Sequence, residues 1–301
     1  MKDGKTIAAL KVQSVALDSI RETFRKRGLI EVMPVILSTV SDPLGPDPGS
    51  RIIGMPEIEY QDQKLVLTTS MILQKQIMVS SGIEKFFAVS PNIRLENVQS
   101  RDTGRHLFEF SQVDFELAHA DMYNVFELMQ ETVTGTINQV KRECSDELAL
   151  WDRELKVPKE FRVFTTNELI ERYGEKWEKG ASEETEDPFW VTNHKREFYD
   201  AEDPEKPGFY RNYDLMYPEG FGEALSGGER EWVFDRILMR IERDGLSTDD
   251  FKPYLEFARN GFVPSAGAGL GVERLTRFLV GASHVGDVQA FRRVPGEKVV
   301  I

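Results

Sequence analysis

The sequence predicts an α+β fold in which amphipathic helices flank antiparallel strands. Apolar residues recur at helical spacing in residues 7–27 and again in residues 121–143. Between them, residues 93–116 predict one β-hairpin, in which polar and apolar side chains alternate strictly after Arg105. The 301 residues contain no internal repeat or low-complexity linker, so we expect a single domain over residues 1–301.

The first helix is expected over residues 7–27. Gly28 provides a usual C-terminal stop, and three basic residues stand immediately before it. Residues 29–37 then predict a strand, although this strand contains Pro34. Strands tolerate proline mainly at edges or where the hydrogen-bond ladder is interrupted, so we expect an edge, with a bulge or a partner there.

Turn-forming residues dominate the segment 41–49, S-D-P-L-G-P-D-P-G, which predicts a loop whose carboxylates face either solvent or a site. A short strand follows over residues 64–69. The next helix covers residues 71–81 and is closed by Gly82, and residues 85–94 form the first arm of the hairpin. The opening half of the chain is therefore mixed α and β.

The second arm of the hairpin carries many polar side chains. Strict alternation after Arg105 places one polar set on one face and a mainly apolar set on the other. One face can therefore pack in the core while the other binds a polar ligand. The first face comprises Phe110, Gln112, Asp114 and Glu116, and the second comprises Leu107, Ser111, Val113, Phe115 and Leu117.

The long helix after the hairpin is expected to begin at an Asp121 cap and to run to about Glu143, with an apolar inner stripe. Residues 144–208 contain charged, proline-containing loops such as S-E-E-T-E-D-P and A-E-D-P-E-K-P-G around short apolar runs. We interpret this segment as a surface insertion into the same domain.

The composition argues against several classes of protein. A formal net charge of −13 opposes a broad surface for phosphate backbones, and so argues against nucleic acid as the main partner. Cys144 is the only cysteine and the four histidines are scattered, so neither a disulfide framework nor a zinc site is expected. The N-terminus lacks an apolar signal core, and no uncharged run approaches the ~20 residues that span a bilayer. We expect a cytoplasmic protein without membrane contact.

Two glycine-flanked segments near the C-terminus have the composition of backbone near a ligand. In residues 220–230, the oxygen groups of Glu223 and Ser226 suit magnesium held jointly with substrate phosphates. In residues 264–275, small residues lead into an apolar helix with Arg274 near its start. Glycines allow close backbone approach, and an arginine at a helix N-terminus attracts anions.

Three blocks of the chain, in order, resemble the signature motifs of class II aminoacyl-tRNA synthetases of the aspartyl and asparaginyl branch. The first helix and the strand with Pro34 resemble motif 1, the dimerisation element. Residues 93–116 resemble motif 2, residues 267–275 resemble motif 3, and residues 223–230 match as well. The resemblance implies a homodimer and an antiparallel sheet of about six strands flanked by helices.

The whole layout is similar to a narrower family, the free-standing archaeal-type asparagine synthetases related to asparaginyl-tRNA synthetase. The segments that carry this likeness include T-S-M-I-L-Q-K-Q, S-P-N-I-R-L-E, S-G-G-E-R-E-W and P-S-A-G-A-G-L-G-V-E-R. Because motif 1 begins within the first ten residues, we expect no anticodon-binding domain and no tRNA partner. The resemblance implies that ATP converts aspartate to asparagine through an adenylate, with Mg²⁺ as cofactor.

By motif match, Arg94 and Arg274 are the predicted catalytic cations, because attack of a carboxylate on the α-phosphorus of ATP builds negative charge. Arg94 would touch the α-phosphate and the reacting carboxylate, and Arg274 the γ-phosphate of a bent ATP. Phe110 would stack on adenine, with Arg274 on the other ring face. The remaining ATP contacts are His106 in the motif 2 loop, Glu96 or Glu109 at the adenine amine, and Glu223 with Ser226 at magnesium.

Lys75 and Arg230 match the synthetase positions that clasp the side-chain carboxylate of aspartate. An asparaginyl site has no use for that lysine, so Lys75 favours a dicarboxylate substrate. Two departures from the aspartyl pattern, Ile72 and Ser265, are consistent with a rearranged ammonium pocket. The other predicted aspartate contacts are Ser70, Gln112, Asp114 as acceptor from the α-ammonium group, and Asp42 as a weaker candidate for that group.

Making asparagine requires the β-carboxylate beside Arg94, which sends the α-carboxylate toward Lys75 and Arg230. Aspartate would then bind reversed relative to the tRNA enzymes. Ammonia must attack as the free amine, so a nearby carboxylate that takes a proton is useful. Glu116 and Asp114 both lie on the right face, and the sequence does not choose between them. No glutamine-hydrolysing module is evident, so free ammonia is the expected nitrogen source.

Two other functions fit part of this pattern. A synthetase paralogue could transfer activated aspartate to another amine, a protein lysine or a tRNA. A catalytically inactive amino-acid sensor could keep the fold alone. The joint presence of a phosphate clamp and a magnesium pair argues against the sensor, because a sensor needs neither.

Overall fold

The protein is described from a computed structural model, which covers residues 4–44 and 50–299. A mixed sheet of eight strands forms its centre, and a three-stranded sheet of order β2-β4-β3 stands beside it. In spatial order the main sheet contains β1 (Ile30–Glu31), β5 (Lys85–Ile93), β6 (Glu109–Ala118), β11 (Ser265–Gly271), β10 (Gly222–Glu229), β9 (Asn212–Tyr217), β8 (Phe189–Thr192) and β7 (Val163–Thr165).

The six strands from β5 to β8 pair antiparallel throughout, as the sequence predicts. Only the outermost strands differ, because β1 pairs with β5 and β7 pairs with β8 in parallel. The expected α+β fold with a helix-flanked antiparallel sheet is confirmed.

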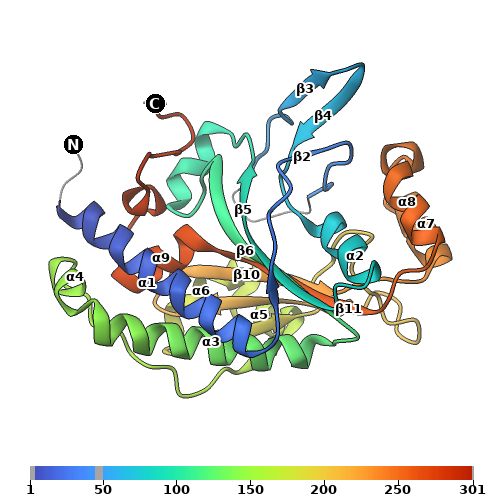
Figure 1. Cartoon of the computed structure of the whole chain (residues 1–301). Coiled ribbons are helices and arrows are strands. Elements are labelled where there is room, and N and C mark those ends of the chain that lie inside the picture. The colour runs from blue at the N-terminus through green and yellow to red at the C-terminus, as the bar shows by residue number, and fades with distance from the viewer. Residues whose placement is uncertain (1–3, 45–49, 300–301) are drawn as a thin grey trace.

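Helices α1 (Gly4–Lys26), α3 (Met122–Glu143) and α9 (Val272–Val280) cover one face of the main sheet (Figure 1). The apolar stripes of these helices and the apolar face of the sheet form one core, where Phe24 packs edge-on against Phe87. Asp121 caps α3 through a capping box, as predicted. Figure 1 shows α1 and α3 lying side by side along this face.

The predicted strand over residues 29–37 is interrupted. Only β1 and β2 (Leu37–Ser38) form ladders, with β5 and β4 respectively. The residues between them belong to no strand, although the Val32 N–H donates to the Phe87 carbonyl oxygen and the Ile36 carbonyl oxygen accepts from the Thr68 N–H. Pro34 lies in this gap, and a residue without an N–H cannot donate to a ladder. The predicted interruption at Pro34 is found, but the strands on either side of it are shorter than predicted.

The segment 144–208 is less superficial than expected. It supplies α4 (Ser145–Leu150), β7, α5 (Thr166–Tyr173), α6 (Trp177–Glu184) and β8, and every residue of β8 is buried. Trp190 stacks on Phe126 with ring centroids 4.1 Å apart. The interpretation as a surface insertion therefore fails for β8. In the sequence, the short apolar run F-W-V-T of this strand is flanked by charged segments, which made it difficult to recognise as part of the core.

A second apolar cluster joins α2 (Ile72–Ser80), α7 (Phe234–Arg243) and α8 (Lys252–Arg259). The hairpin of β3 (Glu57–Tyr60) and β4 (Gln63–Leu67) projects from the body of the molecule (Figure 1). Of the turn-rich loop predicted over residues 41–49, residues 45–49 lie outside the described residues. Within the described ranges, no helix combines the length and apolarity needed to cross a membrane.

Candidate active site

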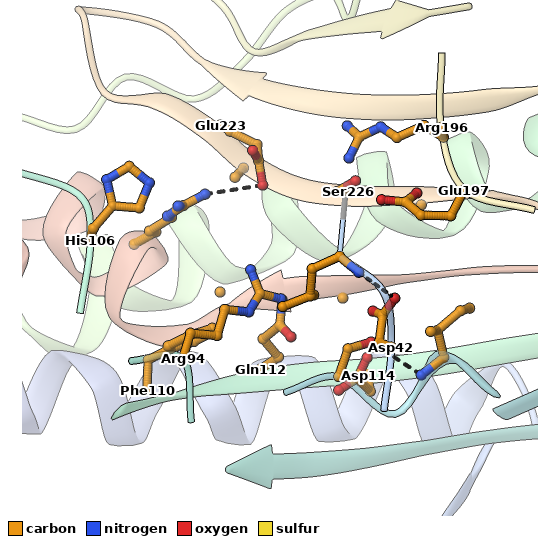
Figure 2. Close-up of a pocket in the computed structure, with 18 of the residues that line it drawn as sticks. Asp42, Arg94, His106, Phe110, Gln112, Asp114, Arg196, Glu197, Glu223 and Ser226 are labelled. Atoms are coloured by element: carbon orange, nitrogen blue, oxygen red, sulfur yellow. Dashed lines mark hydrogen bonds and ion pairs between the residues drawn. The ribbon is translucent and has the colours of Figure 1, made fainter. Parts of the chain in front are cut away.

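A cavity opens on the polar face of the main sheet and collects nearly all of the predicted site residues. It is bordered by strands β6, β10 and β11, by helix α2, and by the loop between β8 and β9. Figure 2 shows His106 and Phe110 at one end, and Asp42, Asp114 and Glu197 at the other. The predicted residues that line it are Asp42, Ser70, Lys75, Arg94, Glu96, His106, Phe110, Gln112, Asp114, Glu223, Ser226, Arg230 and Arg274.

Alternate glycines in β11 make room for this cavity. Ala266, Ala268 and Leu270 point into the core, whereas the glycines between them lie on the opposite face, where Gly269 lines the cavity. A Cβ added to Gly267 would overlap Glu116 Oε2, and one added to Gly269 would stand 3.0 Å from Gln112 Nε2. These glycines are needed for space, because neither has a positive φ.

Lys75 and Asp114 form a buried ion pair in the cavity wall. Lys75 Nζ lies 2.8 Å from Asp114 Oδ1 and also donates to the Ala268 carbonyl oxygen at 3.0 Å. The other oxygen of Asp114 accepts from the Ser90 hydroxyl. Asp114 is therefore already bound on both oxygens, which weakens its predicted role as acceptor from a substrate ammonium group.

Arg230 is held by two carboxylates. Its Nε donates to Glu116 Oε1 at 3.1 Å, and its Nη1 donates to Asp200 Oδ1 at 2.6 Å. Its Nη2 donates to the Gly267 carbonyl oxygen at 2.9 Å. The Ser265 hydroxyl also donates to Glu116 Oε1. Glu116 is thus committed to Arg230 and Ser265, so it is a poor candidate for a proton acceptor.

The end predicted to hold ATP contains stacked and paired cations. The Arg94 guanidinium carbon lies 5.2 Å from the centroid of the Phe110 ring, close enough for a cation–π contact. Arg274 Nη1 lies 3.0 Å from Glu223 Oε1. His106 Nδ1 lies 2.6 Å from the Thr103 hydroxyl oxygen, which fixes the imidazole at the cavity edge.

A bulge in β10 brings the predicted magnesium pair onto one face. In a regular strand, residues three apart point to opposite faces. The register of β10 against β9 shifts between Glu223 and Leu225, so Glu223 and Ser226 both line the cavity. A carboxylate with a hydroxyl fits magnesium that is shared with phosphate oxygens. Among residues 4–44 and 50–299 no group of three or more His, Cys, Asp or Glu could hold a metal by itself.

The two glutamates proposed for the adenine amine are distinguished by position. Glu96 lines the cavity and accepts from the Ser50 hydroxyl, the Arg51 backbone N–H and the Ser100 hydroxyl. Glu109 is exposed, pairs with Arg293 at 3.1 Å and does not line the cavity. Of the two, Glu96 is the better placed.

Four of the cavity residues that the sequence analysis missed belong to the segment interpreted as a surface insertion. Within the run H-K-R-E-F-Y-D, Arg196 binds both oxygens of Asp214 at 2.8 and 2.7 Å. The Tyr199 hydroxyl donates to Asp42 Oδ1 at 2.9 Å. The available signal was a charged run directly after an apolar strand. The four residues are Arg196, Glu197, Tyr199 and Asp200.

Burial shifts the pKa of several cavity groups. The pKa of Glu197 is raised to about 7, mainly by burial, while Arg196 opposes the shift and the charges of Asp42 and Asp200 add to it. Burial also raises the pKa of Asp200, against the pull of Arg230. Burial likewise raises the pKa of Glu273 to about 7. Glu197 and Glu273 are therefore both near their midpoint at neutral pH, which is unusual for carboxylates on a solvated surface.

The sheet, its helices and this cavity have the architecture of a class II synthetase catalytic core. Residues 1–295 match the family described as tRNA synthetases class II (D, K and N). The chain belongs to this family, whose relatives below are ligases.

Curated relatives align along almost the whole chain. Asparagine–tRNA ligase of Thermococcus kodakarensis is 29% identical, over 98% of this chain and 71% of the relative. Aspartate–tRNA(Asp/Asn) ligase of Methanopyrus kandleri is 31% identical, over 95% of this chain and 67% of the relative. Asparaginyl-tRNA synthetase from Pyrococcus horikoshii, solved with asparaginyl-adenylate, superimposes with a TM-score of 0.87 and 27% identity, covering 98% of this chain and 70% of that chain.

The expectation of no tRNA partner is contradicted by these relatives, because those named above are tRNA ligases. The expectation rested on the net charge of −13 and on the position of motif 1 within the first ten residues. A net charge sums over the whole molecule, whereas phosphate contacts require only a local basic surface. Acidic composition was therefore the wrong criterion.

Proposed function

We propose that this protein is an ammonia-dependent, AMP-forming asparagine synthetase. It would activate the β-carboxylate of L-aspartate with ATP and pass the β-aspartyl adenylate to ammonia, giving asparagine, AMP and pyrophosphate. The observation that carries this proposal is the pair of buried cations Lys75 and Arg230, which border the same cavity as Arg94 and Arg274. Two separate cationic positions suit a substrate that has two carboxylates.

Lys75 and Arg230 retain capacity for a substrate carboxylate despite their internal partners. An ammonium group has three donors, and Lys75 uses two of them, for Asp114 and Ala268. Arg230 Nη1 carries two hydrogens, of which the bond to Asp200 requires one. Both cations are held rigidly by their partners, which lowers the entropy cost of binding the substrate.

In this proposal aspartate binds with its β-carboxylate beside Arg94 and its α-carboxylate toward Lys75 and Arg230. Its α-ammonium group would approach Asp42, which accepts from the Tyr199 hydroxyl but has no cationic partner among the described residues. Asp42 takes this role in place of Asp114, because Asp114 is bound to Lys75 and Ser90. Ser70 and Gln112, which also line the cavity, would complete the pocket.

The phosphates of ATP would lie between the two catalytic arginines. Arg94 would neutralise charge at the α-phosphate during attack, and Arg274 would hold the γ-phosphate. Glu223 and Ser226 would hold Mg²⁺, which when bound polarises the phosphate oxygens. Phe110 would stack on adenine, and Glu96 and His106 would border the nucleotide.

A second copy of the chain is the proposed structural partner. The segment from β1 to β2 carries large exposed apolar side chains, of which Met33 is 87% and Ile30 is 60% exposed. Exposed apolar residues gathered in one segment favour a protein interface, and we propose a homodimer of single catalytic domains, each over residues 1–301. Met33→Asp should shift the mass measured by sedimentation from that of a dimer to that of a monomer. A variant that stays a dimer would place the interface elsewhere, and a wild-type protein that is already a monomer would contradict the homodimer.

The second candidate function is ligation of aspartate or asparagine to tRNA, which is favoured by the names of the relatives. Both functions share the activation of an amino acid by ATP. They differ in which amino acid is activated and in which acceptor receives it. Amino-acid-dependent exchange of pyrophosphate into ATP compares aspartate with asparagine directly. Stronger exchange with asparagine would contradict the proposed substrate.

The acceptor is tested by incubating the protein with aspartate and magnesium ATP, with ammonium, with tRNA, with both or with neither. Mass spectrometry of amino acids and nucleotides then reports the products. Asparagine and AMP that depend on ammonium are the expected result. Aminoacylated tRNA without asparagine would support the ligase instead, and AMP without either product would indicate another amine as acceptor.

A further inference from the structure

The carboxylates that line the cavity differ in what they contact. Six of them are engaged by protein donors: Asp42 by Tyr199, Glu96 by Ser50 and Ser100, Asp114 by Lys75, Asp200 by Arg230, Glu223 by Arg274 and Glu273 by the Ser111 backbone N–H. Within the described part of the chain, Glu197 has neither a side-chain hydrogen bond to another residue nor an ion pair. A half-buried carboxylate without a partner carries a desolvation cost that a stabilising contact does not offset.

The position of Glu197 is fixed by its neighbour. Arg196 is clamped to both oxygens of Asp214, a residue of β9. Asp214 lies opposite Ser226 in the ladder between β9 and β10. Figure 2 shows Glu197 on the Ser226 side of the cavity, at the end where Asp42 and Asp114 lie and away from His106. Glu197 is thus held near the amino-acid end rather than the adenine end.

We propose that Glu197 is the general base of the amine-transfer step. This proposal rests on the proposed function, since it requires an amine that attacks the aspartyl adenylate. The nitrogen of ammonia bonds to the β-carbonyl carbon, and the bond from that carbon to the phosphate oxygen breaks as AMP leaves. The proton lost by nitrogen passes to the Glu197 carboxylate, and from there to solvent.

The surroundings of Glu197 suit this role. Asp42 from the loop after β2, and Asp200 and Tyr199 from its own segment, face Glu197, whereas Arg196 supplies the main opposing charge. Two neighbouring carboxylates attract ammonium into this end of the cavity. Burial, with a smaller contribution from these two charges, raises the pKa of Glu197 to about 7, close to the value that a general base needs at neutral pH.

The two carboxylates that the sequence offered for this task are less available. Asp114 is bound to Lys75 and to Ser90, and Glu116 is bound to Arg230 and to Ser265. A carboxylate that accepts from a buried cation must lose that contact before it can take up a proton. Glu197 can take a proton without breaking a contact to another residue.

The test separates the two half-reactions in Glu197→Gln. Aspartate-dependent exchange of pyrophosphate into ATP reports activation, and formation of asparagine reports amine transfer. We expect the variant to lose amine transfer by ~100-fold or more while exchange falls far less, because general base catalysis contributes on that order. Glu205→Gln, an exposed carboxylate in the same loop, is the matched control and should behave as wild type.

Two further readouts distinguish proton transfer from binding. At constant free ammonia, the wild-type rate should rise through pH 7 as Glu197 loses its proton, and this limb should vanish in Glu197→Gln. Hydroxylamine is a weaker base that is unprotonated at neutral pH, so its transfer to give aspartyl hydroxamate should be reduced less than ~10-fold in the variant.

The possible failures are distinguishable. Equal loss of exchange and amine transfer, with a raised KM for aspartate, would show that Glu197 binds the substrate ammonium group and would overturn the general base. An unchanged rate and pH profile in the variant would do the same. If wild-type protein exchanges pyrophosphate but makes no asparagine, then the proposed function itself fails, and this role fails with it.

Discussion

Lys75 and Asp114 face each other across the cavity wall with Nζ and Oδ1 2.8 Å apart and with each side chain only 3% exposed. Removing one member of a buried ion pair leaves an uncompensated charge, whereas replacing both with apolar groups is often tolerated. The pair therefore contributes to stability and to substrate binding by separable physical effects.

Lys75→Met should lower the free energy of unfolding by ~3 kcal/mol, because it strands Asp114 in the protein interior. It should also lower aspartate-dependent pyrophosphate exchange by ~100-fold through loss of the carboxylate clasp. Urea unfolding and exchange assays measure the two effects. The double variant Lys75→Met with Asp114→Leu should recover stability but not exchange. An unchanged KM for aspartate in the single variant would remove Lys75 from the substrate site.

Gly267→Ala should destabilise the protein by ~2 kcal/mol or more, because the new Cβ would overlap Glu116 Oε2 and the Phe115 carbonyl oxygen. The matched control is Gly54→Ala, since a Cβ there meets nothing within 4 Å. Thermal unfolding of both variants measures the difference. Equal melting temperatures would mean that β11 moves to accept a side chain at low cost.

Glu223→Gln should raise the magnesium concentration that gives half-maximal pyrophosphate exchange by ~10-fold, because the amide keeps the shape but removes the negative charge that favours a hard cation. The measurement is a magnesium titration at fixed ATP. Gln74→Glu, outside the cavity lining, restores the net charge in the double variant and should not rescue the affinity. An unshifted titration curve would exclude Glu223 as a ligand.

Glu273 should make the protein less stable as the pH rises from about 4.5 to about 7. Burial raises its folded pKa from 4.5 to about 7, so the folded state favours the protonated form and pays for ionisation above the unfolded pKa. The difference corresponds to roughly 3 kcal/mol, present below pH 4.5 and lost by pH 7. Glu273→Gln should remove this dependence in urea unfolding across that pH range. Parallel pH profiles for wild type and variant would contradict it.

Much of the fold followed from the period of the side chains. Alternation in β6 correctly separated Val113 and Phe115 in the core from Gln112 and Asp114 in the cavity. Helix stripes likewise identified α1 and α3. These patterns work because burial acts on each residue within a single element.

Other features depend on contacts that a linear pattern does not carry. Glu197 lines the cavity but belongs to a charged loop, and the composition of this loop is equally typical of a solvated surface. Asp114 and Glu116 were assigned to substrate binding and proton transfer. Their ion pairs with Lys75 and Arg230 could not be predicted, because these partners lie far away in the sequence. A tertiary ion pair changes the role of a residue without changing its pattern.

The bulge in β10 makes the direction of the Glu223 and Ser226 side chains depend on the number of residues between them. If β10 lost this bulge with no change in the number of residues, Glu223 and Ser226 would stand three apart in a regular strand, and one of them would turn away from the cavity. The sheet could keep its hydrogen bonds while the magnesium pair is separated. Homologues that retain this pair should have either this bulge or one residue fewer between its two members. An engineered one-residue insertion that leaves a single bulged residue should separate the pair and abolish activity in a protein that still folds.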